Sequence, residues 1–184
     1  MPSGYTTALP TSVALDVGIL YYSSTTVFGV SDGGLRASPQ KEWQNIPFDN
    51  KRDDIETLDR TLKAPLIISG EFIQLSDAMF SADLLEPGAT PTTSGTPTTV
   101  TYTPYGHSAL FAAGDYIAGL RYEVTRADSK KVCWVAAYAF VEKYEIISQD
   151  KNTTKVSVEL HSRLGATDAA TSTDKASYSV QVVG

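Results

Sequence analysis

The 184-residue sequence predicts a mainly β protein with antiparallel strands. Apolar and polar residues alternate strictly over residues 155–161, where Val156, Val158 and Leu160 share one side and charged or polar residues the other. The same period of two recurs over residues 120–125. Only one segment shows helical spacing. A period of two with so little helical signal favours an antiparallel sheet that buries one face.

The second half of the chain predicts a meander over residues 119–163. Its first strand is followed by Asp128 and Ser129, which suit a hairpin turn. The next segment, residues 132–141, is apolar on both sides, so we expect a central strand covered on both faces. A further strand over residues 144–147 precedes the turn at residues 150–152. Residues 178–183 predict a closing C-terminal strand.

The first half has the same pattern with more interruptions. Residues 17–22 and 26–30 predict strands, and the turn expected at residues 32–34 contains two glycines, which tolerate positive φ. Residues 35–48 and 62–75 each predict a long extended stretch. Prolines within both stretches limit them to edges or bulges, because proline cannot donate to a ladder.

One flanking α-helix is expected from Ser76 to about Leu85. Ser76 can cap its start, Asp77 suits the positive end of its dipole, and Gly88 follows its end. The apolar residues within it recur at helical spacing, which indicates packing against a core. Residues 86–103 are rich in Thr, Pro, Ser and Gly and predict an exposed insertion, with an extended stretch near residues 98–102. No linker divides the chain, so residues 1–184 are expected to form a single domain.

Composition argues against several classes of function. Fifteen basic against 21 acidic residues give a net charge of −6, which disfavours nucleic acid as a tightly bound partner. Cys133 is the only cysteine, so neither an intrachain disulfide nor a thiolate metal cluster can form. No apolar run is long enough to span a membrane. The first ten residues lack signal-peptide features, so we expect synthesis and assembly in a cytoplasm.

The sequence predicts no enzyme activity, metal site or cofactor. His107 is followed by Ser108, but adjacent side chains on an extended chain point apart, and no carboxylate is placed to orient the imidazole. His161 lies alone on the polar side of a strand. Phosphate-binding glycine loops, zinc-ligand spacings and strand–turn–helix serine motifs are all missing from the sequence. We therefore expect a structural or binding role.

A charged segment over residues 49–60 is the main candidate contact element. Eight of its twelve residues are charged, with both signs mixed. It fails as a calcium loop because its third, sixth and twelfth residues are Lys51, Asp54 and Arg60. Mixed charges suit partner choice and register. The residues assigned to an inter-subunit contact are Asp49, Lys51, Arg52, Asp53, Asp54, Ile55, Glu56, Leu58, Asp59 and Arg60.

The order of these elements resembles the major tail (tail tube) proteins of bacteriophages with long, non-contractile tails. The segments that resemble the family, in order, are Leu-Asp-Val-Gly-Ile-Leu at 15–20, Gly-Val-Ser-Asp-Gly-Gly-Leu at 29–35, the charged segment, Leu-Lys-Ala-Pro-Leu-Ile-Ile-Ser-Gly-Glu-Phe at 62–72, the helix, and Gly-Asp-Tyr-Ile at 114–117 before the meander. The insertion at residues 86–103 departs from the family.

The resemblance implies a β-sandwich or split barrel whose subunits form hexameric rings. These rings would stack into a hollow tube in the virion tail, with residues 49–60 reaching an adjacent ring. The implied partners are further copies of the chain, a tape measure protein, a tail terminator and distal tail or baseplate proteins. DNA would pass through a negative lumen as cargo and would not be bound specifically, and no membrane would be involved.

Two other classes of function remain open on the sequence. Ten tyrosines and the uncharged Thr-rich segments are compatible with a sandwich that binds carbohydrate or a host surface. A decoration protein of the virion is the second alternative. Binding of glycans by a monomer would favour the first, and addition to capsids without tube formation would favour the second.

Overall fold

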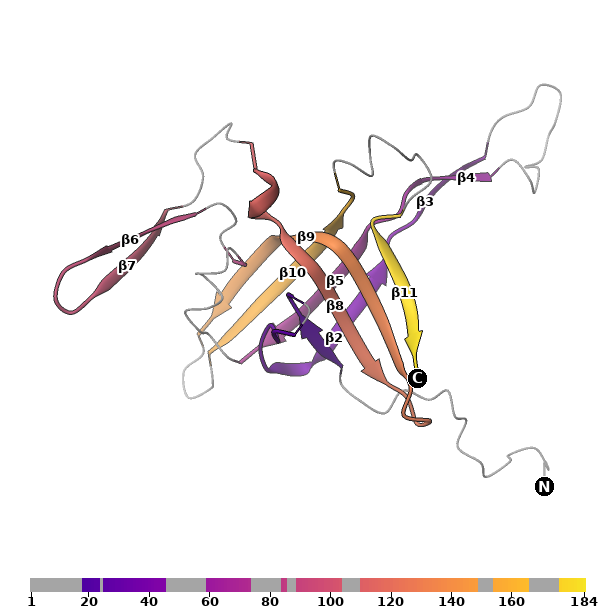
Figure 1. The fold of residues 1–184 in the computed structure, drawn as a ribbon, viewed down its shortest axis with the longest axis horizontal. Helices are drawn as coiled ribbons and strands as arrows, with labels where there is room; N and C mark the ends of the chain where they lie inside the picture. Colours follow the sequence, from indigo (N-terminus) through magenta and orange to yellow (C-terminus); the bar gives the residue numbers. More distant parts are fainter. Residues whose placement is uncertain are drawn as a thin grey trace.

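A curled antiparallel sheet forms the body of the protein in the computed structural model (Figure 1). The structure describes residues 18–23, 25–45, 59–73, 84–85, 89–103, 110–148, 154–165 and 176–184. The strands are β1 (Ile19–Tyr21), β2 (Ser31–Pro39), β3 (Glu42–Asn45), β4 (Asp59–Lys63), β5 (Leu66–Phe72), β6 (Thr90–Ser94), β7 (Thr99–Thr103), β8 (Ile117–Thr125), β9 (Lys131–Ile147), β10 (Lys155–Arg163) and β11 (Tyr178–Val183).

Seven strands make the main sheet, in the order β1-β8-β9-β10-β5-β2, with β11 also paired to β9. Because β8 occupies one side of β9 over residues 131–139, β10 and β11 share the other side. There β11 pairs with residues 131–136 of β9, and β10 pairs with residues 138–147. The prediction of a mainly β, antiparallel fold with a meander and a C-terminal strand is confirmed.

The sheet curls so that strands distant in its order meet. The Tyr122 hydroxyl on β8 donates to the Leu35 carbonyl on β2 at 3.2 Å. Phe28 N–H donates to Leu20 O at 2.7 Å, and Ile73 N–H donates to Val30 O at 3.0 Å, so the segment after β1 runs from β1 to the end of β5. The curl creates one concave face, and the apolar side chains of the strands converge there.

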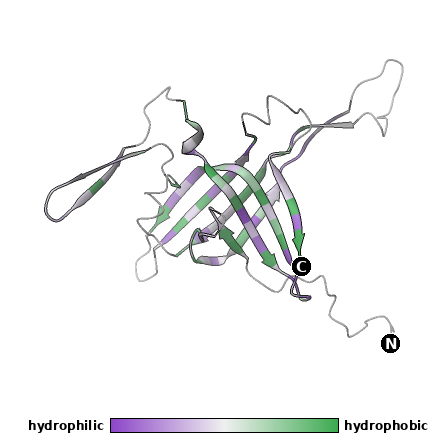
Figure 2. Cartoon of the chain, in the orientation of Figure 1, coloured by the Kyte–Doolittle hydropathy of each residue, from purple (hydrophilic) through white to green (hydrophobic). Residues whose placement is uncertain are grey.

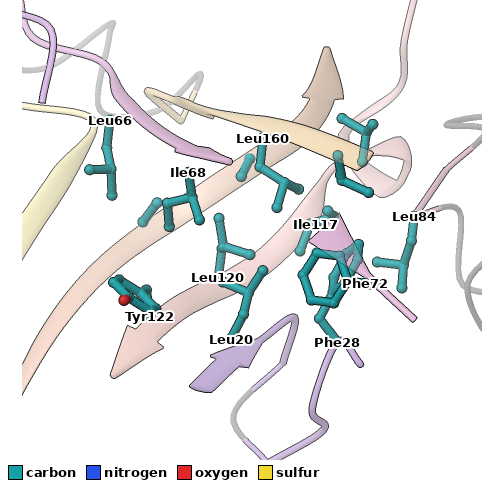
Figure 3. Close-up of a cluster of buried hydrophobic side chains, with 14 of the residues drawn as sticks. Leu20, Phe28, Leu66, Ile68, Phe72, Leu84, Ile117, Leu120, Tyr122 and Leu160 are labelled. Atoms are coloured by element: carbon teal, nitrogen blue, oxygen red, sulfur yellow. The ribbon is translucent and has the colours of Figure 1, made fainter. Parts of the chain in front are cut away.

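The core fills this concave face (Figure 3). Phe28 and Phe72 lie with ring centroids 4.8 Å apart, and Tyr122 stacks on Trp134 at 5.5 Å. The alternation predicted for β10 is confirmed, since its residues are buried at every second position. Other buried members of the core are Leu20, Leu66, Ile68, Leu84, Leu85, Ile117, Leu120, Val124, Val141, Val156, Val158 and Leu160.

Three sequence expectations about the strands need correction. Gly33 and Gly34 do not close a turn; both have positive φ (77° and 85°) and form a bulge inside β2, where the register shifts between Asp32 and Leu35. Residues 132–141 and 144–147 are not separate strands but parts of the 17-residue β9. The strand is also not covered on both faces, because Tyr138 within it is 36% exposed. The strand predicted over residues 26–30 is not formed, and an isolated bridge between Val27 and Tyr21 is found in its place.

The expected helix lies mostly outside the described residues, which include only its end. Leu84 and Leu85 lie in a bend and are buried in the core. The one helical element within the described ranges is the short 3-10 helix η2 (Ala113–Asp115). The insertion contains more structure than expected, because β6 and β7 pair over residues 90–103 as a hairpin that projects from the sheet (Figure 1).

Candidate functional site

The expected contact segment, residues 49–60, falls largely outside the described residues. Asp49, Lys51, Arg52, Asp53, Asp54, Ile55, Glu56 and Leu58 are among those that the structure does not describe. Asp59 and Arg60 belong to β4, whose backbone pairs with β3. Asn45 pairs with Asp59, so the two chain ends that bound the segment are held side by side. Its role in contact therefore stays a prediction, with a defined point of attachment.

That attachment is a continuous two-stranded ribbon. Pro39 pairs with Leu66 at the end of the main sheet. Three residues further along one strand and three residues back along the other, Glu42 pairs with Lys63, so the register continues unchanged from β2–β5 into β3–β4. A backbone hydrogen bond from Gln40 N–H to Pro65 O (2.8 Å) bridges the two paired regions. The strands β2 and β5 are thus extended by β3 and β4, and Figure 1 shows this extension leaving the body of the sheet.

Exposed apolar side chains distinguish the β3–β4 ribbon. Trp43 is 61% exposed and Leu62 is 50% exposed. Leu62 is the extra residue of a bulge, since Glu42 pairs with Lys63 but Trp43 already pairs with Thr61. The Lys41 ammonium lies 5.7 Å from the centroid of the Trp43 ring. A large aromatic side chain left in solvent on a projecting ribbon is typical of a surface that another protein covers.

Trp43 is not among the predicted contact residues, although the sequence around it contains a signal. The tryptophan stands between Glu42 and Gln44 on a stretch that prolines restrict to an edge. Tryptophan is a frequent anchor of protein interfaces, and an aromatic residue among polar neighbours on an edge strand has no core to enter. The register of the ribbon was the missing information, because it decides how far Trp43 lies from the core.

A second exposed apolar region lies on β11. Val180, Val182 and Val183 are 54%, 61% and 49% exposed. The strand is anchored at its start, where the Ser177 hydroxyl donates to Ala64 O at 3.1 Å and lies 2.5 Å from the Ser162 hydroxyl. Ser162 is buried and also accepts a hydrogen bond from Leu66 N–H at 2.8 Å. These bonds fix β11 and the start of β5 relative to β10.

The charged side chains of the sheet are mostly compensated by neighbours. Lys155 on β10 binds Asp32 at 2.6 Å and Glu71 at 3.1 Å. The hydrogen bond to Asp32 makes the largest contribution to raising the pKa of Lys155, followed by the bond to Glu71. Glu123, only 6% exposed, is bound by Lys131 and lies 3.5 Å from Arg121. Such pairs neutralise charge within the sheet and bring no reactive group forward.

Cys133 is buried beside Glu123 on the same pair of strands. Its sulfur lies 4.0 Å from a Glu123 carboxylate oxygen. Burial, and then the nearby negative charge, raise the pKa of the Cys133 thiol. A thiol with a raised pKa is a poor nucleophile, which agrees with the expectation that Cys133 behaves as a small apolar residue.

The histidines do not form a catalytic arrangement in the described part of the chain. His107 lies outside it, whereas His161 on β10 has a ring nitrogen 2.6 Å from Glu159 and the other 3.9 Å from Glu142. Arg163 binds the same Glu142 at 3.1 Å and its guanidinium lies 4.2 Å from the centroid of the Phe140 ring. The ring nitrogens of His161 therefore lie next to carboxylates and not next to a hydroxyl or thiol nucleophile.

The described residues contain neither a metal-binding cluster nor a membrane-spanning helix. Within those ranges no group of three or more His, Cys, Asp or Glu side chains is arranged to hold a metal ion. Nor does any helix there have the length and apolar character needed to cross a membrane. A hollow at the β2 bulge, lined by residues 32–36 and 69–71, is bounded by the ion pairs of Asp32 and Glu71.

Comparisons with known proteins leave the family open. No protein-family model matches the chain, and a search of curated proteins finds no significantly similar sequence.

Proposed function

We propose that this chain is a structural subunit that assembles with copies of itself into rings stacked as a hollow tube, in the manner of a bacteriophage tail tube protein. The single observation that carries the proposal is the β3–β4 ribbon. It extends the hairpin of β2 and β5 beyond the core and exposes Trp43 and Leu62 next to the charged segment. A ribbon of this kind has little use in a monomer but provides a contact arm in an assembly.

The finer fold belongs to the same proposal. A sheet that curls until β8 contacts β2, together with the flanking helix that the sequence predicts from residue 76 to about residue 85, corresponds to a split barrel or sandwich. Subunits of this shape are suited to line a tube, because the strands of neighbouring copies can continue one another. The net charge of −6 supports a lumen that DNA crosses without binding. The tape measure, terminator and distal tail proteins are the expected partners in a virion.

Electron microscopy of the purified protein tests the function. Rings or tubes are the expected result, at high protein concentration or with extracts that supply the tail partners. A protein that stays strictly monomeric under both conditions would overturn the proposal. Glycan binding by such a monomer would favour the adhesion module, and addition to capsids would favour the decoration protein.

The charged segment is tested by reversing its basic pair. Lys51→Glu combined with Arg52→Glu should leave the fold intact, because surface substitutions usually change stability by no more than about 0.5 kcal/mol. We expect shorter or fewer tubes, since the mixed charges set register with the adjacent ring. Lys143→Glu, a charge reversal at an exposed position on β9, serves as a control outside the ribbon. Tubes of normal length and stability at physiological salt would show that residues 49–60 are not the inter-ring contact.

A further inference from the structure

The two elements that most need a partner are β11 and the β6–β7 hairpin. In the described part of the chain, β11 pairs along one edge with β9 and along the other with no strand. The hairpin forms a separate two-stranded sheet. An isolated hairpin is marginally stable in water, and an edge strand offers unpaired backbone groups as a template for another strand.

Both elements lack the charges that usually protect an edge. Proteins commonly place lysine or another charged residue on edge strands to prevent pairing with other molecules. Neither β7 nor β11 contains Asp, Glu, Lys or Arg, although the chain as a whole has 36 such residues. In Figure 2, which colours residues by hydropathy, the hairpin is mostly pale with a green portion, whereas purple and green alternate on the main sheet. Valine and threonine, abundant in the two strands, favour the strand conformation.

The two strands of the hairpin differ in how well their outer edges can pair with another strand. β6 contains Pro91, which has no N–H and weakens pairing on that side. β7 contains no proline, and Val100 at its centre is 47% exposed. With five residues, β7 also matches the six residues of β11 in length. The open edge of β7 is therefore the better donor of a strand.

The positions of the two elements exclude pairing within one molecule. In Figure 1 the β6–β7 hairpin extends from one side of the sheet, and β11 lies at the opposite side. A donor on one side and an acceptor on the other produce a head-to-tail contact, which closes into a ring or continues as a helix. A second copy of the chain satisfies both edges at once.

We propose that β7 of one copy pairs with the open edge of β11 of the next, so that the hairpin extends the neighbour's main sheet. The inference rests on the proposed self-assembly, for which it names the lateral contact. Val180 and Val182 lie along that edge of β11, and adding the hairpin would cover exposed valine surface on both strands.

Cysteine cross-linking between two differently labelled proteins tests the pairing. One protein has Thr101→Cys in β7, and the other has Gln181→Cys in β11. The two proteins are mixed and treated with a short bis-maleimide, and each is also treated alone. Both proteins also have Cys133→Ala, because Gln181 lies opposite Cys133 in the β9–β11 pairing and two thiols there would react within one molecule. We expect a heterodimer from the mixture and little dimer from either protein alone. Lys143→Cys, an exposed position on β9, replaces Gln181→Cys as the matched control and should give no heterodimer.

The outcomes separate this inference from the proposed function. Rings or tubes that form without the Thr101–Gln181 cross-link would overturn the pairing while the proposed function stands. Dimers from Gln181→Cys alone would indicate that two β11 strands pair symmetrically, which also overturns it. Absence of any assembly would overturn both.

A charge on the edge provides an independent measurement. Val182→Lys should weaken self-association by at least about tenfold in sedimentation experiments, because lysine on an edge strand opposes pairing. Ser148→Lys adds the same charge at an exposed position away from both strands and should leave association unchanged. Since Val182 is 61% exposed, the thermal stability of the monomer should be preserved. Equal association of the two variants would contradict the proposal.

Discussion

The concave core and the β3–β4 ribbon place apolar side chains in opposite surroundings. Phe72 in the core is 1% exposed and packs on Phe28, whereas Trp43 on the ribbon is 61% exposed. Both residues lie on the long hairpin that begins with β2 and ends with β5. One hairpin therefore serves two purposes: its first part stabilises the subunit, and its extension is available to contact another molecule.

Truncation of the core should have the largest effect. Phe72→Ala removes a fully buried ring and its contact with Phe28, so the free energy of unfolding should fall by about 3–5 kcal/mol. Urea denaturation followed by tryptophan fluorescence measures the loss. A change of less than about 1 kcal/mol would mean that this part of the sheet is not packed as described.

Loss of the buried hydroxyl that ties three strands should have the next largest effect. Ser162→Ala leaves Leu66 N–H without its acceptor and removes the contact with Ser177, which should cost about 1–3 kcal/mol. The same denaturation experiment applies. Ser157→Ala, on the outer side of β10, is the matched control and should be nearly neutral. Amide exchange in β11 should also accelerate in the Ser162 variant only.

Truncation on the ribbon should separate stability from assembly. Trp43→Ala removes a side chain that makes little contact with the core, so monomer stability should change by no more than about 0.5 kcal/mol. Assembly should weaken by at least about tenfold if Trp43 anchors a neighbour. Sedimentation velocity measures association, and Thr61→Ala provides an exposed control on the facing strand. Normal assembly of the Trp43 variant would break the contrast between core and ribbon.

Alkaline pH should produce the smallest effect. Hydrogen bonds to carboxylates raise the pKa of Lys131 and of Lys155 in the folded protein, so their contribution to stability is fully present below the unfolded pKa of about 10.4. It is lost as the pH rises through the higher folded value. Lys155→Met should therefore be less stable than the parent at neutral pH, and the difference should shrink above about pH 10.5. A constant difference would show that the lysine acts through packing alone.

The predictable parts of the fold are those where a local pattern has one structural meaning. The alternation over residues 155–161 is found as expected, because a period of two places one side of a strand against a core. The strand at residues 178–183 is also found, although all of its residues after the first are exposed. The double glycine was misplaced, since positive φ serves a bulge as well as a turn. Residues 86–103 were expected to form an exposed insertion with one extended stretch near residues 98–102, which agrees with β7. Its pairing with β6 was not expected, because the uncharged Thr- and Pro-rich segment shows no alternation of apolar and polar residues.

The candidate contact surfaces also differ in how much of them the sequence reveals. The charge of residues 49–60 is visible in the sequence, and its calcium-binding interpretation fails on residue identity alone. The exposure of Trp43 and of the valines in β11 is not visible, because apolar residues on a strand normally indicate burial.

Local patterns in the sequence are enough to predict an antiparallel β protein with a meander, and the composition gives its acidic balance and its single cysteine. The fold was needed to show that β2 and β5 continue into a ribbon beyond the core and that β10 and β11 share one side of β9. It also shows that, among the described strands, none pairs with the outer edge of β11. The physical reason is that strand period and turn residues are local properties. Pairing partners, and therefore which edges and apolar faces stay uncovered, depend on contacts between residues far apart in the chain.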